Sequence, residues 1–313
     1  MNAIVYHAFG PADLLRAEQL PMPDVTDNHV LVAVRATSVN VIDSRVREGK
    51  MGILVSKHFP KTPGSDVAGV VESVGTGVSR FRPGDEVFGA TNPFQGGAFA
   101  DFVALPEGAL AVKPPAMSFE QAAALPITGL AALYALRELG EIHQGSRVLI
   151  YGSSGSAGLF AIQLGKLLGG HVTGVCGTNG VELCQRFGAD VVLDYRSGPV
   201  TLNGLYDIVI DFSGHFAFEA ARQQMTEHGR FIDPSPTVPQ FVGAKIANPF
   251  RSQKDMMLQT ESKAEDLEFL ASLVESGKLK VTIAKSFPMA QAQRAFELQE
   301  QGGVLGKIVV TIP

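Results

Sequence analysis

A run of alternating strand and helix patterns that begins at Arg147 constrains the fold of this chain more than any other feature. The stretch RVLIY has the composition of a buried strand, and AGLFAIQLGKLLG after it repeats apolar residues at helical spacing. Further strands are predicted at HVTGVC, VVLDY, YDIVIDF and GRFID, with helices at VELCQRFG and around residues 216–225. Strands that alternate with helices predict a parallel, doubly wound sheet.

The first third of the chain has a different pattern, in which short strands are separated by glycine-rich turns. The predicted strands are 28–37, 67–74, 86–90 and two short ones within 98–112. These strands predict an all-β unit. Beyond it, Ser118 is expected to cap a helix, residues 130–139 have helical spacing, and a helix over 263–275 precedes a closing strand, GKIVVTI.

A glycine-rich loop, YGSSGSAG at 151–158, joins the first strand of the alternating run to its helix. Glycines let the backbone approach a pyrophosphate, and the amide groups at a helix N-terminus face its negative charge. In this strand–loop–helix setting the loop predicts a dinucleotide site, although a turn that serves packing alone is the alternative. The residues expected to hold the pyrophosphate are Ser154, Gly155, Ser156 and Ala157.

The end of the second strand of this run bears on the choice of cofactor. NAD-specific sites place an acidic residue there to bind the ribose 2′-hydroxyl, but residues 175–181 read VCGTNGV. Without a carboxylate to repel a 2′-phosphate, NADP(H) is favoured over NAD(H), and Gly177, Thr178 and Asn179 are candidate donors to the phosphate. The lack of arginine or lysine in this turn favours NAD(H).

Composition excludes several other classes of protein. The net charge is −5 and no basic stripe is present, so a nucleic-acid partner is not expected. No apolar stretch reaches about 18 residues, so no membrane span is expected. The start MNAIVYHAFG lacks the pattern of a signal peptide, and Cys176 and Cys184 are too few for a disulfide framework or a metal cage. A cytoplasmic location is the expectation.

Six stretches of the chain carry a recognisable pattern: 39–49, 63–89, 125–136, 151–166, 187–196 and 305–312. Together they resemble the medium-chain dehydrogenase/reductase superfamily, and within it the zinc-free quinone oxidoreductase and enone reductase branch. The resemblance implies an α/β fold, with a GroES-like β domain over 1–117 and 279–313 and a Rossmann doubly wound parallel sheet domain over 118–278. It also implies NADPH as cofactor, a cleft between the domains and a homodimer.

The resemblance also supplies a test for zinc. Zinc-dependent relatives place a cysteine at the position of Asn40, a His-Glu pair at Ser65-Asp66, and a cysteine or aspartate near Ile127. A catalytic zinc ion needs three protein ligands, and none of these positions keeps a good one. Residues 91–97, TNPFQGG, replace the four-cysteine lobe of the structural zinc. No metal site is therefore expected.

Further cofactor contacts follow from the resemblance alone. It implies that Tyr195 lies near the adenosine phosphate, that Thr128 lies near the nicotinamide amide, and that Phe212, Ser213 and Gly214 pass close to the nicotinamide ring. Tyr195 could instead serve packing at a strand end, and Thr128 could serve as a helix cap. Pocket-lining side chains are expected from 48–60, 91–97 and 235–252.

Without zinc, the substrate carbonyl needs another hydrogen-bond donor, and Asn40 is the candidate catalytic residue. The alternative is that Asn40 only holds its loop in place. Asp43 is expected to orient its neighbours rather than transfer protons. Many relatives have tyrosine at the position of Arg45, which either favours a more polar substrate or lies solvated at the surface.

The leading hypothesis is a zinc-independent, NADPH-dependent oxidoreductase that reduces quinones or the C=C bond of α,β-unsaturated carbonyls. Interconversion of alcohols and aldehydes is a second hypothesis, which the missing Lewis acid disfavours. A third is an NADPH-binding sensor without turnover. Assays of NADPH binding and of NADPH oxidation distinguish the three.

Overall fold

The computed structural model describes residues 1–234 and 238–313 and, within them, all side chains but those of Ile53 and Val238. The chain forms two compact units, one of residues 1–130 with 261–313 and the other of residues 131–260. Cys176 and Cys184 are both free and buried. In the described part of the chain no helix has the length and apolar character needed to cross a membrane.

The first unit is built on a seven-stranded sheet with the order β14-β15-β3-β4-β5-β7, to which β6 adds by pairing with β3. All neighbouring strands in it are antiparallel except β14 and β15. A separate hairpin joins β1 (Asn2–Val5) to β2 (Arg16–Gln19). The sheet strands are β3 (His29–Val39), β4 (Asp66–Val74), β5 (Glu86–Ala90), β6 (Phe102–Pro106), β7 (Leu110–Val112), β14 (Ile283–Pro288) and β15 (Lys307–Thr311).

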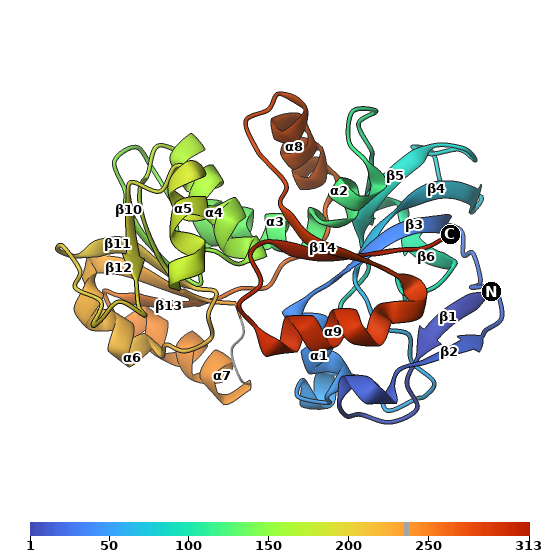
Figure 1. Cartoon of the computed structure of the whole chain (residues 1–313), viewed down its shortest axis with the longest axis horizontal. Helices are drawn as coiled ribbons and strands as arrows, with labels where there is room; N and C mark the ends of the chain where they lie inside the picture. Colours follow the sequence, from blue (N-terminus) through green and yellow to red (C-terminus); the bar gives the residue numbers. More distant parts are fainter. Residues whose placement is uncertain (235–237) are drawn as a thin grey trace. The chain divides into compact units, whose positions relative to one another are not determined.

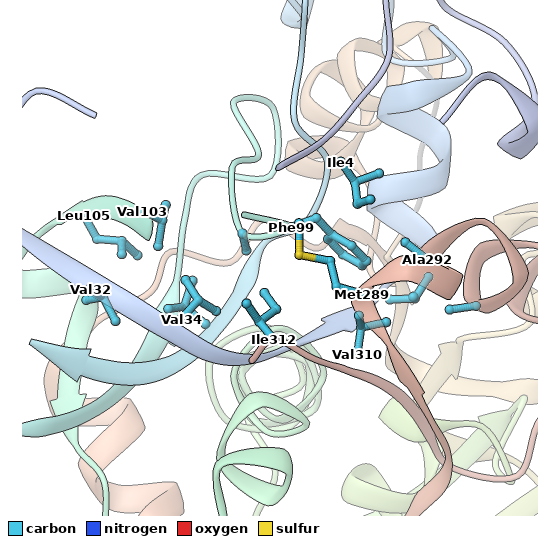
Figure 2. Close-up of a cluster of buried hydrophobic side chains, with 14 of the residues drawn as sticks. Ile4, Val32, Val34, Phe99, Val103, Leu105, Met289, Ala292, Val310 and Ile312 are labelled. Atoms are coloured by element: carbon cyan, nitrogen blue, oxygen red, sulfur yellow. The ribbon is translucent and has the colours of Figure 1, made fainter. Parts of the chain in front are cut away.

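Short helices surround this sheet. They are α1 (Val41–Arg47), α2 (Phe119–Ala123), the start of α3 (Pro126–Tyr134), α8 (Ala264–Glu275), α9 (Ala292–Gln301) and the 3₁₀ turns η1 (Ala12–Leu14), η2 (Gly52–Leu54), η3 (Glu107–Ala109) and η8 (Met289–Gln291). Apolar side chains from β3, β6 and β15 meet Phe99, Met289 and Ala292 in the core (Figure 2). The expected cap is present, because Ser118 Oγ accepts a hydrogen bond from Gln121 N at 3.1 Å.

The second unit is a six-stranded sheet with the order β10-β9-β8-β11-β12-β13, in which every neighbouring pair is parallel. Numbered from β8, this order is 3-2-1-4-5-6, the order of a Rossmann sheet. The chain changes direction across the sheet between β8 and β11, and ligands bind at such a switch point. The strands are β8 (Arg147–Tyr151), β9 (His171–Cys176), β10 (Val191–Asp194), β11 (Tyr206–Asp211), β12 (Met225–Asp233) and β13 (Lys254–Met257).

Helices cover both faces of this sheet, with α4 and α5 on one side and α6 and α7 on the other (Figure 1). The helices are η4 (Ala135–Leu139), α4 (Ser156–Leu167), η5 (Thr178–Gly180), α5 (Val181–Arg186), α6 (Phe218–Ala221), η6 (Arg222–Gln224), α7 (Val238–Ala247) and η7 (Asn248–Phe250). The prediction of a doubly wound parallel sheet is confirmed.

Several elements differ from the sequence-based expectation. The first third is not all β, because α1 interrupts it directly after β3. Residues 235–237 of the expected loop lie outside the described residues, and most of the remainder forms α7 and η7. Pro239 stands at the start of α7, where its missing N–H removes no helical hydrogen bond.

The compact units do not coincide with the predicted domains, whose boundaries at 117/118 and 278/279 stay a prediction. Residues 118–130 and 261–278 belong to the first unit rather than to the second. The physical reason is packing, since α2 contacts β3 and β4, and α8 contacts β7.

Gly158 shows why the loop between β8 and α4 needs a glycine in the helix. A Cβ at this position would lie 2.4 Å from the carbonyl oxygen of Gly152 and 2.6 Å from Ser153 Cα. Both contacts are with backbone atoms, so the loop would have to shift. We expect Gly158→Ala to lower the free energy of unfolding by roughly 1–3 kcal/mol, as overpacking does, in urea denaturation.

Gly243 is the matched control, because it lies exposed in α7 and a Cβ there would meet nothing within 4 Å. Gly243→Ala should stabilise the chain by up to about 1 kcal/mol through helix propensity alone. Equal effects of the two substitutions would contradict the close approach at Gly158.

Candidate active site

The glycine loop after β8 has the geometry of a phosphate-binding turn. Gly152 has a φ of +70°, a left-handed conformation that favours glycine, and Ser153 N donates to Val175 O at 3.1 Å. Gly155 is the N-cap of α4, so the amide groups of Ser156 and Ala157 lie in its first turn, where they have no intrahelical acceptor. Residues 154–157 are half-buried and therefore reachable from solvent. This arrangement can bind an anion.

The loop after β9 lies against the glycine loop and against the end of β10. A Cβ on Gly180 would meet Ser154 Cβ at 2.4 Å, and one on Gly177 would lie 3.3 Å from both Tyr195 Oη and Arg196 Nε. Thr178 and Asn179, in η5, are exposed, as is Tyr195 at 54%. The structure thus brings the predicted residues of this loop together with Tyr195.

Two charged groups in this region were missed by the sequence reasoning. Arg196 is exposed beside Gly177 and lies 5.9 Å from the ring centroid of Tyr195, so the region does contain a cation. Asp194 Oδ2 accepts a hydrogen bond from Thr178 Oγ1 at 2.7 Å. Hydrogen bonds from Ser197 and then Thr178 lower the pKa of Asp194. The turn after β9 holds no acid of its own, but the neighbouring strand supplies one.

The loop after β11 is fixed by the carboxylate of Asp211, which is 2% exposed. Asp211 Oδ1 accepts from Ser213 N at 2.9 Å, Ser213 Oγ at 2.5 Å and Gly214 N at 3.1 Å, while Oδ2 accepts from Phe216 N at 2.8 Å. A Cβ on Gly152 would lie 2.9 Å from Ser213 N, so this loop touches the glycine loop. Asp211 therefore anchors the predicted residues Ser213 and Gly214, directly after Phe212, at the switch point of the sheet.

In the first unit, the position of the candidate Asn40 lies within a group of buried polar side chains. We call Asn40, Asp43, Ser65, Asp66 and Lys307 the buried polar cluster; each is at most 4% exposed. Lys307 Nζ donates to Asn40 Oδ1 and lies 3.2 Å from Asp66 Oδ2. Asp43 Oδ1 accepts from Ser65 Oγ at 2.5 Å. The buried ammonium thus pairs directly with one carboxylate, Asp66, and the second carboxylate, Asp43, lies in the same cluster.

The amide of Asn40 is fully engaged within this cluster. Its Nδ2 donates to Asp43 Oδ2 at 3.1 Å and to Asp66 Oδ2 at 2.9 Å, and its Oδ1 accepts from Lys307. An asparagine amide has two donor hydrogens, and both have acceptors here. Donation by Asn40 to a substrate oxygen therefore requires one of these hydrogen bonds to break.

The cluster extends to the start of α3. Asp66 Oδ1 accepts from Ile127 N at 2.8 Å, in the first turn of that helix. Thr128 follows directly and is 9% exposed, with its hydroxyl 3.4 Å from Ala124 O. One carboxylate thus links Asn40 to Ile127, the residue directly before Thr128. Arg45, which stands at the position of the tyrosine in many relatives, lies on α1 and is half-buried.

Lys307 was also missed, because the closing strand GKIVVTI carries the pattern of an apolar strand and hides a buried charge. It lies 267 residues from Asn40 along the chain.

Burial raises the pKa of Asp43 to about 6, and Asp66 adds to the effect, while hydrogen bonds and Lys307 oppose it. Among the described residues no group of three or more His, Cys, Asp or Glu side chains is arranged to hold a metal ion.

A β unit followed by a Rossmann sheet with a glycine loop at its switch point defines the medium-chain class of dehydrogenases and reductases. Comparison with family models agrees. Residues 26–115 match the alcohol dehydrogenase GroES-like domain, and residues 187–310 match the zinc-binding dehydrogenase domain.

Individual relatives narrow the class. The chain is 33% identical to the chloroplast envelope quinone oxidoreductase homolog of Arabidopsis thaliana, over 99% of this chain and 98% of that protein. It is 32% identical to the chloroplastic NADPH-dependent alkenal/one oxidoreductase of the same plant, over 99% and 79%. The solved quinone oxidoreductase of Coxiella burnetii is 30% identical, with a TM-score of 0.93 over 100% of this chain and 99% of that one. The chain therefore belongs to the quinone oxidoreductase branch of the medium-chain dehydrogenase/reductase superfamily, and it is an oxidoreductase.

The raised pKa of Asp43 gives stability a specific pH dependence. Its folded pKa of about 6 lies above the unfolded value of 3.8, so the folded chain binds the proton more tightly. The resulting stability is complete below pH 3.8 and is lost as the pH rises through 6. Between pH 5 and 7.5 the loss is about 1 kcal/mol. In Asp43→Asn, urea unfolding at the two pH values should lack this component.

Asp255, in the second unit, serves as an internal reference. Burial and then Asp233 raise its pKa to about 6 as well, so its contribution remains in both proteins. Only the difference between wild type and Asp43→Asn reports on Asp43. An unchanged pH dependence in the variant would refute the assignment.

Proposed function

We propose that this protein is an NADPH-dependent reductase of quinones or of the C=C bond of α,β-unsaturated carbonyls, and that it works without zinc. One observation carries the proposal, namely the meeting of the loops after β8, β9 and β11 at the switch point of the parallel sheet. Such loops, with a helix N-terminus among them, suit a dinucleotide phosphate. Hydride is what NADPH supplies when bound.

Residues of the second unit, together with Thr128 of the first, would bind the cofactor. Ser154, Gly155, Ser156 and Ala157 would hold the pyrophosphate, and Gly177, Thr178, Asn179 and Tyr195 the adenosine phosphate. Phe212, Ser213 and Gly214 would lie along the nicotinamide ring, and Thr128 near its amide. Support comes from the half-buried amides of the α4 turn and from the rigid anchoring of Ser213 and Gly214 by Asp211.

Zinc independence is supported by the donor set of the buried polar cluster. Asn40, Ser65 and Ile127 offer no strong zinc ligand, and the single carboxylate at these positions, Asp66, already faces the Lys307 ammonium at 3.2 Å. A second cation beside that ammonium would be repelled. Reduction of a C=C bond or a quinone fits this setting better than aldehyde reduction, which gains most from a Lewis acid.

Asn40 is the proposed donor to the oxygen that gains negative charge as hydride reaches the substrate. Its place at the N-cap of α1, beside the exposed Val41, favours this role. Its amide must first give up Asp43 or Asp66 as acceptor. The relatives support both substrate classes, since one is named a quinone oxidoreductase homolog and another an alkenal/one oxidoreductase.

Steady-state oxidation of NADPH with a soluble quinone, a small enone and a small aldehyde tests the proposal. We expect turnover with the quinone or the enone, little with the aldehyde, and no change after treatment with a strong zinc chelator. Tight binding of NADPH without turnover on any acceptor would support the sensor instead. Loss of activity with the chelator, restored by zinc, would overturn zinc independence.

Arg196 is the proposed counter-charge for the 2′-phosphate, because it is an exposed cation beside Gly177 and Tyr195. Its positive charge also offsets the negative charge of the nearby Asp194. In Arg196→Leu we expect the dissociation constant of NADPH to rise about tenfold, the loss of one charge-assisted hydrogen bond, while that of NADH stays unchanged. Fluorescence titration with each cofactor at constant ionic strength measures both.

Arg186→Leu is the matched control, since Arg186 is an exposed arginine in the last turn of α5. It should leave both dissociation constants near the wild-type values. Equal weakening of NADPH and NADH in Arg196→Leu would rule out a contact with the 2′-phosphate.

A homodimer and a location in the cytosol complete the proposal. The dimer is supported by three apolar side chains on α7 and η7, Val242, Ile246 and Phe250, which are 49%, 67% and 88% exposed. The cytosol is supported by the two free cysteines, which fit a reducing compartment.

A further inference from the structure

Lys307 contacts the start of α1 directly, through Asn40, and the start of α3 indirectly, through Asp66 of β4. It donates to Oδ1 of Asn40, the N-cap of α1, and its ammonium lies 3.2 Å from Oδ2 of Asp66. The other oxygen of Asp66 accepts from Ile127 N at 2.8 Å, in the first turn of α3. A single side chain from β15 thus supports the first turns of both α1 and α3.

The side chain of Thr128 is held only weakly by its own hydrogen bond. Its hydroxyl lies 3.4 Å from Ala124 O, a long hydrogen bond, whereas the neighbouring amide of Ile127 is bound at 2.8 Å by an ionisable group. Asp66 therefore anchors this turn to β4. Asp66, with no exposed surface, in turn depends on a buried counter-charge.

We propose that Lys307 is a positioning residue of the reductase, which keeps Asp66 and Asn40 oriented so that the first turns of α1 and α3 hold the geometry required for hydride transfer. Lys307 is 2% exposed and acts through these neighbours rather than on the substrate. The turnover consequences rest on the proposed function, whereas the effect on the buried charges does not.

The role of Lys307 can be measured through the pH at which Asp43 titrates. Asp43 titrates near pH 6, and the groups that face it are Asp66 from β4, Lys307 from β15 and Tyr6, which follows β1. Burial raises the pKa of Tyr6 to about 12, so Tyr6 stays neutral in this range. Removal of the Lys307 ammonium leaves two buried carboxylates without a counter-charge, which moves the titration of Asp43 to higher pH.

Lys307→Met is the test, with Lys113→Met as the matched control. Lys113 is also a buried lysine of the first unit, 5% exposed and 2.8 Å from Glu86, with hydrogen bonds to Pro114 O and Met117 O. Both variants should be less stable. Only Lys307→Met should lower kcat, by about 10- to 100-fold for misplaced groups, with the dissociation constant of NADPH changed less than about threefold.

The pH dependence of unfolding separates positioning from bulk stability. In Lys307→Met the pH at which stability falls should rise by about one unit or more, while Lys113→Met keeps the wild-type value. Lys307→Arg keeps the charge and should retain the wild-type pH dependence, and it serves as the readout if Lys307→Met does not fold. In that case, a rise of about one pH unit or more in Lys307→Arg would contradict the proposal, because this variant keeps the charge.

The outcomes separate this inference from the proposed function. Unchanged kcat and unchanged pH dependence in Lys307→Met, or equal changes in Lys113→Met, would overturn the positioning role. If the wild type turns over no quinone or enone, the proposed function fails. The pH dependence of unfolding in the three variants then decides the inference about Lys307 alone.

Discussion

The first unit depends on one buried ion pair, that between Lys307 and Asp66. Removal of charges from water is costly, and such a pair is tolerated only where hydrogen bonds satisfy the remaining polar atoms. Asn40 and Ile127 N provide these bonds to the two oxygens of Asp66. Asn40 is the N-cap of α1, and Ile127 lies in the first turn of α3. The starts of both helices are therefore in direct contact with the buried charge of Asp66.

In the second unit, backbone groups rather than a buried ion pair hold the loops in place. Gly152 and Gly158 allow the turn after β8 to lie against its own helix, and the carboxylate of Asp211 gathers the amides of the loop after β11. Its charged side chains near the loops, Asp194 and Arg196, lie at the solvent-accessible edge. Selectivity for a phosphate group can therefore change there without disturbing the packing of the sheet.

The sequence predicts most of this architecture, because strand and helix periodicities are local. The strands around β8, the capped helix after Ser118 and the glycine loop all follow from neighbouring residues. Lys307 and Arg196 do not, since their roles depend on partners from other strands. Lys307 meets Asn40 across 267 residues, and Arg196, in the turn after β10, lies beside Gly177 in the turn after the neighbouring strand β9. The sequence does not predict helix α1 either, because its seven residues make too few turns for a clear helical period.

The two groups of charges also respond differently to their surroundings. Arg196 and Asp194 are open to water, so salt screens their effect on the phosphate proposed to bind there, with a screening length of about 10 Å at 0.1 M ionic strength. The buried polar cluster is screened far less, and its state is set by pH through Asp43. Cofactor preference should therefore weaken with ionic strength, while the geometry of α1 and α3 should follow pH. Ionic strength would thus act on cofactor binding, whereas pH would act on the positioning of α1 and α3.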